Sequence, residues 1–453
     1  MTDSEVHNRK VFRQLKEEIK HDVSIFWFRR DLRLKDNCGL YHALRSGKPL
    51  ILLFIFDDKI LDGLALDDPR LSFIYDSLCQ INEEVSAYKS SLVILKGDCK
   101  SLWQDITSSL SIKYVFWNKD YEPYAVRRDR EVYDLLTKKG IKTSKYKDQL
   151  IFEPGEVVKN DASPYTVFTP YSRKWLQRLE TQGIPDNFNS EGYLDQLAPI
   201  SIDLPALGMT GFKESSLKPR SFSAENIEDY DKHRDYPWKD ATTHAGPHLR
   251  FGTLSIRKIV KTAFMVNTTY LGELIWREFF MQILYHYPDV VTKSFRPRYD
   301  SIKWINDKEL FEKWCRGETG YPLVDAGMRQ LKASGYMHNR VRMVTASFLC
   351  KHLLTDWRWG EKYFAEKLLD YELSSNNGNW QWAAGTGCDA APYFRVFNPY
   401  QQAKKFDNDN KYILKWIPEL NTADYPAPIV DHSSARKRAI ETYKYYLNRN
   451  KGK

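Results

Sequence analysis

The stretch VSIFWFRRDLRLKDN at residues 23–37 decides the first half of the fold. Its first six residues, Val23–Phe28, are apolar except for one serine, and a run without polar alternation is typical of a strand buried on both faces. Similar runs follow at Pro49–Asp57, Ser91–Lys96 and Lys113–Trp117, a fifth strand is expected near Thr143–Lys147, and helical stretches such as Asp68–Tyr88 and Ala125–Lys139 separate them. The order strand, helix, strand predicts an α/β domain over residues 23–153 with a five-stranded, parallel, Rossmann-like sheet.

The turn after the first strand is charged. It reads Arg29–Leu34 and lacks the GxGxxG pattern, so an ordinary dinucleotide-binding turn is disfavoured. A salt-bridged turn from strand to helix is favoured over a chemical role for these charges.

Outside residues 23–153 the pattern changes three times. Val11, Phe12, Leu15 and Ile19 are spaced by one to four residues, which predicts an amphipathic helix within residues 1–22. Periodicity is lost over residues 154–223, which are rich in Pro, Gly, Ser and Asp, so we expect a connector there. From residue 224 to 453 a larger all-α domain is expected, and its clearest helices are Leu271–Tyr287, Glu309–Trp314, Tyr321–Lys332, Met337–Leu354 and Trp359–Leu369, followed by a basic helix or tail at Ser434–Lys453.

Composition narrows the class of protein. The net charge of +9 favours a polyanionic partner, although charge also serves solubility. Six scattered cysteines without a CxxC pair support neither a zinc site nor a disulfide framework, so we expect no metal and a reducing compartment. No apolar run approaches the roughly 20 residues that cross a bilayer, and the first residues lack a signal-peptide pattern.

Six motifs occur in an order that identifies a family. They are Trp27–Asn37, Leu274–Phe279, Thr319–Ala326, Met337–Met343, Asn376–Trp382 and Phe397–Pro399. Together they resemble the cryptochrome/photolyase family from Val23 to about Leu420, and the block Met337–Met343 looks like that of class I cyclobutane pyrimidine dimer photolyases. The resemblance implies an all-helical domain that binds FAD and a light-driven lyase that repairs DNA.

The resemblance also implies the residues that hold FAD. Asn376 and the pair Asp370 and Arg342 match positions beside the isoalloxazine ring, where an amide can accept a proton without adding charge. The remaining matching positions are Tyr230, Thr242, Thr243, Gly246, Tyr270, Arg277 and Glu372. Hydroxyls before a helix near Pro247 suit a pyrophosphate, and they would equally cap that helix. His244, Gly246 and Glu372 depart from the family pattern.

A second set of residues is expected to contact the lesion and the DNA. Glu273, Trp276 and Phe280 are spaced i, i+3, i+7 and share a helix face, while Asn339 and Met343 are spaced i, i+4. The resemblance implies that Glu273 forms hydrogen bonds with thymine edges. If Glu273 is protonated, a state that burial favours, it would act as a neutral donor. Trp276 and Trp382 pack against the flipped dimer, and Arg340 contacts phosphate. Relatives that repair 6-4 photoproducts have histidines at the positions of Asn339 and Met343, so a cyclobutane dimer is the expected substrate.

Three tryptophans, Trp380, Trp357 and Trp304, match the family's electron-transfer chain to the flavin, with ordinary core packing as the alternative. An antenna chromophore is left open between a deazaflavin, a flavin and a folate. Tyr124 and Ala125 stand where folate-binding relatives carry asparagine and glutamate, which weakens the folate interpretation.

The main alternative function is a cryptochrome-type blue-light photoreceptor, which would need no lesion pocket and usually carries a long C-terminal extension. We therefore expect a monomer that binds UV-damaged DNA and no membrane, in the cytoplasm of a bacterial-type cell or in a eukaryotic nucleus.

Overall fold

The computed structural model describes residues 2–449, which form two compact units. The first unit holds the chain up to Glu153 together with Arg178–Ser221 and Ala245–Thr262. The second unit holds Pro154–Gln177, Phe222–His244 and the chain from Ala263 onward. The segment expected to be a connector is thus divided between the two units.

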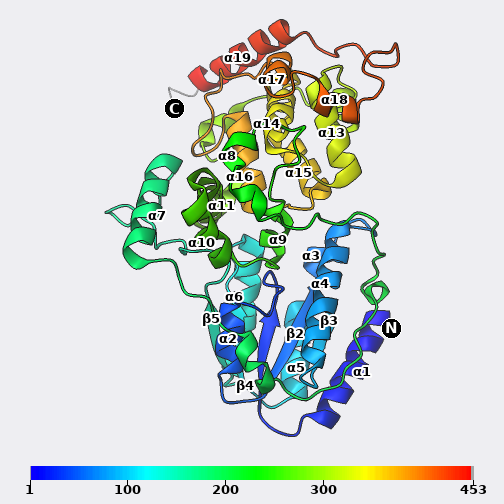
Figure 1. Ribbon diagram of the computed structural model, residues 1–453, viewed down its shortest axis with the longest axis vertical. Helices are drawn as coiled ribbons and strands as arrows, with labels where there is room; N and C mark the ends of the chain where they lie inside the picture. Colours follow the sequence, from blue (N-terminus) through cyan, green and yellow to red (C-terminus); the bar gives the residue numbers. More distant parts are fainter. Residues whose placement is uncertain (1, 450–453) are drawn as a thin grey trace. The chain divides into compact units, whose positions relative to one another are not determined.

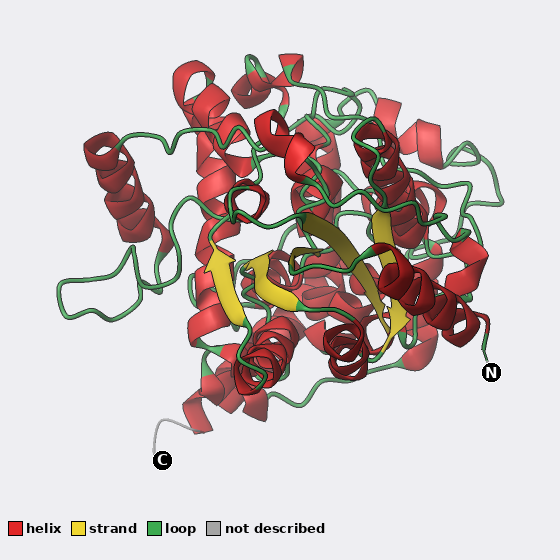
Figure 2. Ribbon diagram, turned by 90° about the horizontal axis from the view of Figure 1, so that it is seen from below, coloured by secondary structure: helices red, strands yellow, loops and turns green. Residues whose placement is uncertain are grey.

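The first unit contains the predicted sheet (Figures 1 and 2). Its strands are β1 (Val23–Phe28), β2 (Leu50–Asp57), β3 (Leu92–Gly97), β4 (Ile112–Asn118) and β5 (Lys142–Tyr146). All are parallel, in the order β3-β2-β1-β4-β5. The five-stranded parallel sheet is confirmed, and its order places β1 at the centre.

Helices cover both faces of this sheet because the strands are apolar on both sides. Ile25 and Trp27 of β1 join a core formed with α1 (Asp3–Glu18), α5 (Cys99–Ser109) and α6 (Pro123–Lys138). Phe26 and Phe28 point the other way and pack with α2 (Cys38–Leu44) and α4 (Pro69–Ser86). The alternation along one buried strand therefore builds two cores back to back. The short α3 (Asp58–Leu61) follows β2.

The predicted N-terminal helix α1 lies beside the edge strand β3 and beside α5 (Figure 1). Val11 and Leu15 are buried, as the apolar stripe predicts. His7 Nε2 lies 2.9 Å from the Ile94 carbonyl, while the Asn8 amide donates to the Lys96 carbonyl at 2.8 Å and accepts from the Lys96 N–H at 3.3 Å. Side chains of α1 thus occupy the backbone groups that an edge strand leaves unpaired.

The charged turn after β1 is salt-bridged, as expected. Arg29 pairs with Asp129, Arg30 lies 3.1 Å from Glu122, and Arg33 lies 2.7 Å from Asp148. All three arginines are therefore occupied within the first unit.

The rest of the chain is helical apart from its loops. The longer helices are α7 (Phe168–Gln182), α10 (Ile256–Val266), α11 (Thr268–His286), α12 (Lys308–Arg316), α13 (Pro322–Ser334), α14 (Asn339–Ser347), α15 (Trp357–Lys367), α16 (Leu373–Ala384), α17 (Pro399–Phe406) and α19 (His432–Arg449). Shorter ones are α8 (Tyr230–His233), α9 (Ala245–Phe251) and α18 (Lys411–Trp416), and the 3-10 turns are Glu191–Gln196, Leu207–Thr210, Glu225–Ile227, Pro288–Val291 and Pro297–Ser301. The predicted all-α region is confirmed. The expected tail at 450–453 lies outside the described residues.

Two element predictions are wrong. The segment 154–223 contains the helix α7, whose buried Tyr171, Trp175 and Leu179 are spaced by four residues. The expected single helix Met337–Leu354 instead ends as α14 at Ser347 and continues as one π-helical turn at Phe348–His352. In a π-helical turn each N–H bonds to the carbonyl five residues earlier. The apolar residues keep nearly the same spacing, so the sequence does not reveal the turn.

In the part of the chain that the structure describes, no helix is both long and apolar enough to pass through a bilayer.

Candidate cofactor and substrate cavity

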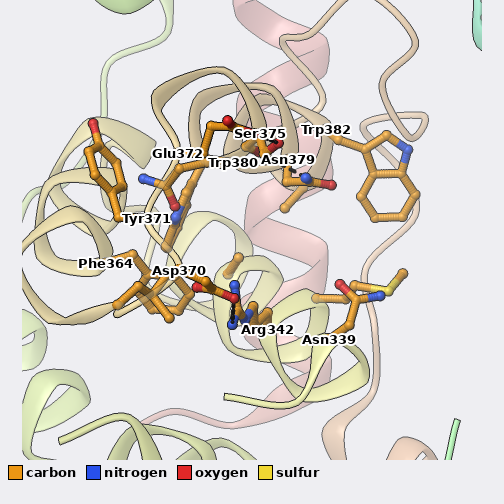
Figure 3. A pocket seen from close by; sticks show the side chains of 15 residues that line it. Asn339, Arg342, Phe364, Asp370, Tyr371, Glu372, Ser375, Asn379, Trp380 and Trp382 are labelled. Atoms are coloured by element: carbon orange, nitrogen blue, oxygen red, sulfur yellow. Dashed lines mark hydrogen bonds and ion pairs between the residues drawn. The ribbon is translucent and has the colours of Figure 1, made fainter. Parts of the chain in front are cut away.

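A cavity of the second unit gathers residues from α14, α15 and α16 and from the loop before α16 (Figure 3). It has about 600 Å³ of empty space, part of it open to solvent. Its lining residues are Asn339, Arg342, Met343, Ala346, Phe364, Leu368, Asp370, Tyr371, Glu372, Ser375, Asn376, Asn379, Trp380, Trp382 and Ala383. Eight of these are residues that the sequence predicted for cofactor, electron transfer or lesion: Asn339, Arg342, Met343, Asp370, Glu372, Asn376, Trp380 and Trp382.

The predicted ion pair between Arg342 and Asp370 is formed. Arg342 Nη2 lies 2.8 Å from Asp370 Oδ2 (Figure 3). Arg342 Nε donates to the Met337 carbonyl at 2.7 Å. The other carboxylate oxygen, Asp370 Oδ1, is buried and has no hydrogen-bond partner among the described residues. A buried acceptor without a donor is costly, so this oxygen is available to a ligand that donates a hydrogen bond.

Asn376 is held by a residue that the sequence did not suggest. Its Nδ2 donates to the Glu361 carbonyl at 3.0 Å and to Glu361 Oε1 at 2.8 Å. Burial raises the pKa of the Glu361 carboxyl, and the hydrogen bond from Asn376 works against that rise. Because both amide hydrogens of Asn376 are used by Glu361, the side chain can offer only its oxygen, as an acceptor.

Trp380 is buried at the cavity wall, with 2% of its surface exposed. Its ring centroid lies 5.0 Å from that of Phe364 and 6.1 Å from that of Trp314. It also presses on Gly360 of α15, where a Cβ would come within 2.1 Å of the indole. Gly360 therefore leaves the space in which Trp380 sits between the two helices.

Asn339, Met343 and Trp382 form another side of the cavity. Asn339 and Met343 come from the first turns of α14, and Figure 3 shows Asn339 and Trp382 away from the Phe364 and Tyr371 end. The guanidinium of Arg395 lies 5.9 Å from the Trp382 ring. This side combines an amide, a thioether and an indole, and none of these groups is an acid.

His338 precedes α14 and caps it, since its Nδ1 accepts the Arg340 backbone N–H at 3.2 Å. Burial lowers its pKa to about 4, and the neighbouring guanidinium groups of Arg342 and Arg340 act in the same direction. At neutral pH the ring is therefore uncharged.

The three predicted lesion residues of α11, namely Glu273, Trp276 and Phe280, are not among the residues that line the cavity. Glu273 Oε1 lies 2.5 Å from Arg234 Nη1, and its side chain is 33% exposed. Burial works against the charge of Arg234, yet the nearby Glu273 raises the pKa of the guanidinium overall. Glu273 is therefore only partly buried and has a cationic partner at contact distance.

Trp276 and Phe280 are packed more tightly than expected. Phe168 of α7 stacks on Trp276 with ring centroids 3.6 Å apart and planes 6° from parallel, so it covers one face of the indole. Phe280 is only 6% exposed, and its ring lies over Gly378, where a Cβ would come within 2.1 Å of it. Phe280 thus belongs to the packing of α11 on α16, and its contact with DNA stays a prediction.

The residues predicted near the pyrophosphate form hydrogen bonds among themselves. Thr243 Oγ1 lies 2.9 Å from the Tyr270 hydroxyl, and the Tyr230 and Tyr270 rings meet edge to face at 4.9 Å. Thr242 Oγ1 lies 3.2 Å from the hydroxyl of Tyr336, whose ring lies 5.9 Å from the Arg342 guanidinium. Tyr336, which the sequence did not suggest, thus connects Thr242 to the cavity.

Three further predicted positions are placed as follows. Arg277 Nε lies 3.2 Å from Glu372 Oε2, so the departure to glutamate at 372 still makes an ion pair. Gly246 lies in the first turn of α9, in the first unit. Arg340 pairs with Asp235, and its guanidinium lies 4.3 Å from the ring centroid of Phe406.

The outer two tryptophans of the predicted chain are both on the second unit. Trp357 is buried at the first residue of α15. Trp304 meets Tyr443 of α19 edge to face at 5.9 Å. The electron-transfer role of the three tryptophans stays a prediction.

Tyr371, Ser375 and Asn379 are lining residues that the sequence analysis missed. Ser375 and Asn379 flank Asn376 on α16, at one residue before it and three after it. A helix presents residues three and four apart on one face, so the pair Ser375 and Asn379 carried a usable signal.

Comparisons with known proteins agree with this arrangement. Residues 24–188 match the family model for DNA photolyase, and residues 270–424 match the model for the FAD binding domain of DNA photolyase. The deoxyribodipyrimidine photo-lyase of Halobacterium salinarum is 36% identical, over 93% of this chain and 98% of its own. A class III photolyase from Agrobacterium tumefaciens superimposes with a TM-score of 0.84 at 31% identity, covering 95% of this chain and 98% of its own. An archaeal photolyase from Sulfolobus tokodaii, solved with two FAD molecules, gives a TM-score of 0.80 at 32% identity, over 94% of this chain and all of its own.

Relatives that are 31% to 36% identical over almost the full length of both chains show common ancestry. The α/β sheet and the helical unit are those of the solved photolyase structures. This chain belongs to the cryptochrome/photolyase family.

Proposed function

We propose that this protein is a light-driven lyase that binds FAD and splits cyclobutane pyrimidine dimers in UV-damaged DNA. One observation carries the proposal: a single cavity joins the Arg342–Asp370 pair and Asn376 to Asn339, Met343 and Trp382. The first group suits a flavin and the second suits an extruded pair of bases. The relatives named deoxyribodipyrimidine photo-lyase support the same reaction.

The residues of the cavity fit FAD. Asp370 Oδ1 lacks a partner among the described residues, Arg342 provides a fixed positive charge, and Asn376 can offer its amide oxygen. When bound and reduced, FAD supplies the absorption of light and a transferable electron. The task of Arg342, Asp370 and Asn376 is to hold the ring without adding net charge, since the ion pair is internally neutral.

The residues proposed for the lesion bind and orient it. Trp382 offers an aromatic face for stacking, and Asn339 offers donors and an acceptor to base edges. On α11, Trp276 keeps one face free of Phe168, and Glu273 can accept hydrogen bonds from thymine N–H groups. Arg340 is the proposed phosphate contact.

The choice of lesion rests on Asn339, Met343 and Trp382 of the cavity, none of which is an acid. Repair of a 6-4 photoproduct needs proton transfer to a migrating group, whereas a cyclobutane ring opens on one-electron reduction. Burial lowers the pKa of His338, which precedes Asn339, to about 4, so its imidazole is uncharged at neutral pH and does not act as an imidazolium acid. We therefore propose cyclobutane dimers as the substrate; membership of class I stays a prediction, as one similar structure is a class III photolyase.

A blue-light photoreceptor is the second candidate for this fold. It would need the flavin-facing residues and a signalling partner, but no set of base-contacting groups. The joint presence of Glu273, Trp276, Asn339 and Met343 favours repair.

Three finer points belong to the proposal. We propose that the chain acts as a monomer, in the compartment that holds the DNA. For an antenna, the structure solved with two FAD molecules makes a flavin the favoured candidate over a deazaflavin or a folate. In this chain Tyr124 donates to Asp57 at 2.6 Å, so its hydroxyl is already used.

The test combines binding and light. The purified protein should retain FAD, and the reduced protein should restore thymine-dimer oligonucleotides under blue light and not in the dark. Asp370→Asn weakens the pair with Arg342 and should lower FAD retention. A protein that retains FAD, is fully reduced and leaves the dimers intact in the light would refute the proposal.

A further inference from the structure

A surface of the second unit combines exposed aromatic rings with cations. We call it the Trp238 patch and define it by Tyr236, Trp238, Lys239 and Lys411. Trp238 is 41% exposed and Tyr236 is 37% exposed. Their ring centroids lie 6.2 Å apart.

Lysines lie against these rings. Lys239 Nζ is 5.3 Å from the Trp238 centroid and 5.4 Å from that of Tyr236. Lys411 Nζ, from the first residue of α18, is 4.7 Å from the Trp238 centroid. Such contacts hold a ring in one orientation while its remaining surface stays open to solvent.

The position of Trp238 is unusual for this chain. Six other tryptophans, Trp27, Trp103, Trp117, Trp175, Trp314 and Trp357, are almost completely buried. An indole left in water next to two ammonium groups contributes little to the core. Its chemistry is that of a surface on which a flat ligand with negative charge can stack.

Arg340 connects the patch to the cavity. It pairs with Asp235, the residue before Tyr236, and stacks over Phe406 at 4.3 Å. Asn339, the residue before Arg340, lines the cavity. Arg340 therefore links the segment that carries the patch, through Asp235, to Asn339, which lines the site proposed for the lesion.

The carboxylates near the patch are already engaged. Asp235 is paired with Arg340, and Asp409 lies 3.2 Å from Lys411 with both side chains more than half exposed. An exposed pair of this kind contributes little and can exchange its carboxylate for a phosphate.

We propose that the Trp238 patch is a second contact for DNA, in which an unpaired base stacks on Trp238 while Lys239 and Lys411 bind backbone phosphates. This inference rests on the proposed function, since it takes DNA as the partner. Aromatic rings beside cations are the usual means by which proteins hold single-stranded nucleic acid, because every base has a face that can stack. Extrusion of a dimer leaves unpaired bases next to the cavity, and these are the proposed ligand.

The experiment compares four variants of the full-length, FAD-loaded protein. Trp238→Ala removes the ring, Trp238→Phe keeps a stacking face, and Lys411→Ala removes one cation. Tyr88→Ala is the matched control, because Tyr88 is 42% exposed and belongs to the first unit. Dissociation constants are measured for a thymine-dimer duplex and for an undamaged single strand, over a series of salt concentrations.

Trp238→Ala should weaken binding of the single strand about tenfold, with a smaller loss for Trp238→Phe and none for Tyr88→Ala. Lys411→Ala should reduce the slope of log K against log salt by about 0.7 on the single strand. FAD content should be that of the wild type in all four variants.

Equal affinity of Trp238→Ala and wild type for both DNAs, with repair intact, would overturn this inference and leave the proposed function standing. A loss of binding that accompanies a loss of FAD would also overturn it, because Trp238 would then be supporting the segment before Thr242. A wild-type protein that neither binds nor repairs dimer DNA would instead refute the proposed function.

Discussion

At the scale of single residues, Trp380 shows how the cavity is built. Its indole fits only because Gly360 of α15 has no side chain, and it packs against Phe364 and Trp314. The motif around Trp380 could be read from the sequence. Trp314 could not, since a buried tryptophan on another helix looks like any core residue until the helices are placed.

Trp380→Phe tests the first step of electron supply. Phenylalanine keeps the ring but is much harder to oxidise, so blue light should no longer reduce the oxidised flavin held by this variant. The fading of the visible flavin absorption under illumination is the measurement, and chemically reduced variant should still repair. Trp416→Phe, outside the cavity lining, is the control. Normal photoreduction in Trp380→Phe would remove Trp380 from the electron path.

Glu273 gives a second residue-scale prediction. Glu273→Gln keeps the shape but leaves Arg234 without its partner at 2.5 Å. Repair per absorbed photon should fall several-fold more than dimer affinity falls, whereas Trp276→Ala should mainly weaken binding, by about tenfold. Quantum yield and dissociation constant are measured on the same oligonucleotide. An unchanged quantum yield in Glu273→Gln would show that the carboxylate serves only Arg234.

The residues that sequence reasoning missed share a cause. Glu361, which fixes Asn376, comes from α15, and Tyr336, which bonds Thr242, comes from the loop after α13. Each lies in a different element from its partner. Spacing along one helix predicts neighbours on that helix, and it carries no information on which other helix will pack there.

At the scale of elements, α1 protects the edge of the sheet. Its side chains bond Ile94 and Lys96 of β3 and bury Val11 and Leu15. Removal of residues 2–20 should expose an apolar surface and an open edge strand, with a loss of about 3 kcal/mol or more in unfolding free energy. Light scattering after chromatography should show self-association. A truncated chain with the size and unfolding midpoint of the full chain would contradict this role.

The π-helical turn carries a buried lysine that predicts a pH effect. Lys351 Nζ donates to the Ala384 carbonyl at 2.7 Å and lies 3.7 Å from the Tyr443 ring, and burial lowers its pKa from 10.5 to about 7. Between these values the unfolded chain binds more protons than the folded one. Stability from this group therefore rises as pH increases from about 7 to 10.5 and is constant below 7.

Lys351→Met removes this dependence. The Ala384 carbonyl keeps the Tyr443 hydroxyl as a donor at 2.8 Å, so the variant should be about 2–4 kcal/mol more stable than wild type near pH 6. Most of that difference should vanish near pH 9. Urea unfolding at the two pH values is the measurement, and an equal difference at both would show that Lys351 stays charged in the fold.

Secondary-structure elements differ in how well they can be predicted from the sequence. The five strands were predicted to within one or two residues at each end. For β1 and β2 the reason is that strands buried on both faces are continuous apolar runs. Helix α7 was missed, although Tyr171, Trp175 and Leu179 give it a clear stripe, because Pro170 and the flanking Gly and Pro residues suggested a loop.

At the scale of the whole molecule, the sequence predicted the family and the two classes of structure, an α/β sheet and a helical unit. It could not predict how the chain divides. Arg178–Ser221 and Ala245–Thr262 return to the first unit after the chain has entered the second. Domains predicted as consecutive segments cannot include such discontinuous units, because contacts between residues far apart in the chain determine which unit a segment joins.

The central claim is that this family member repairs cyclobutane dimers and not 6-4 photoproducts. The most direct test is mass analysis of two oligonucleotides, each with one of these lesions, after illumination with reduced, FAD-loaded protein and in matched dark samples. We predict that the cyclobutane dimer is converted to two thymines in the light alone, and that the 6-4 photoproduct is unchanged. Conversion of the 6-4 photoproduct with the cyclobutane dimer untouched would contradict the account of Asn339, Met343 and the neutral His338.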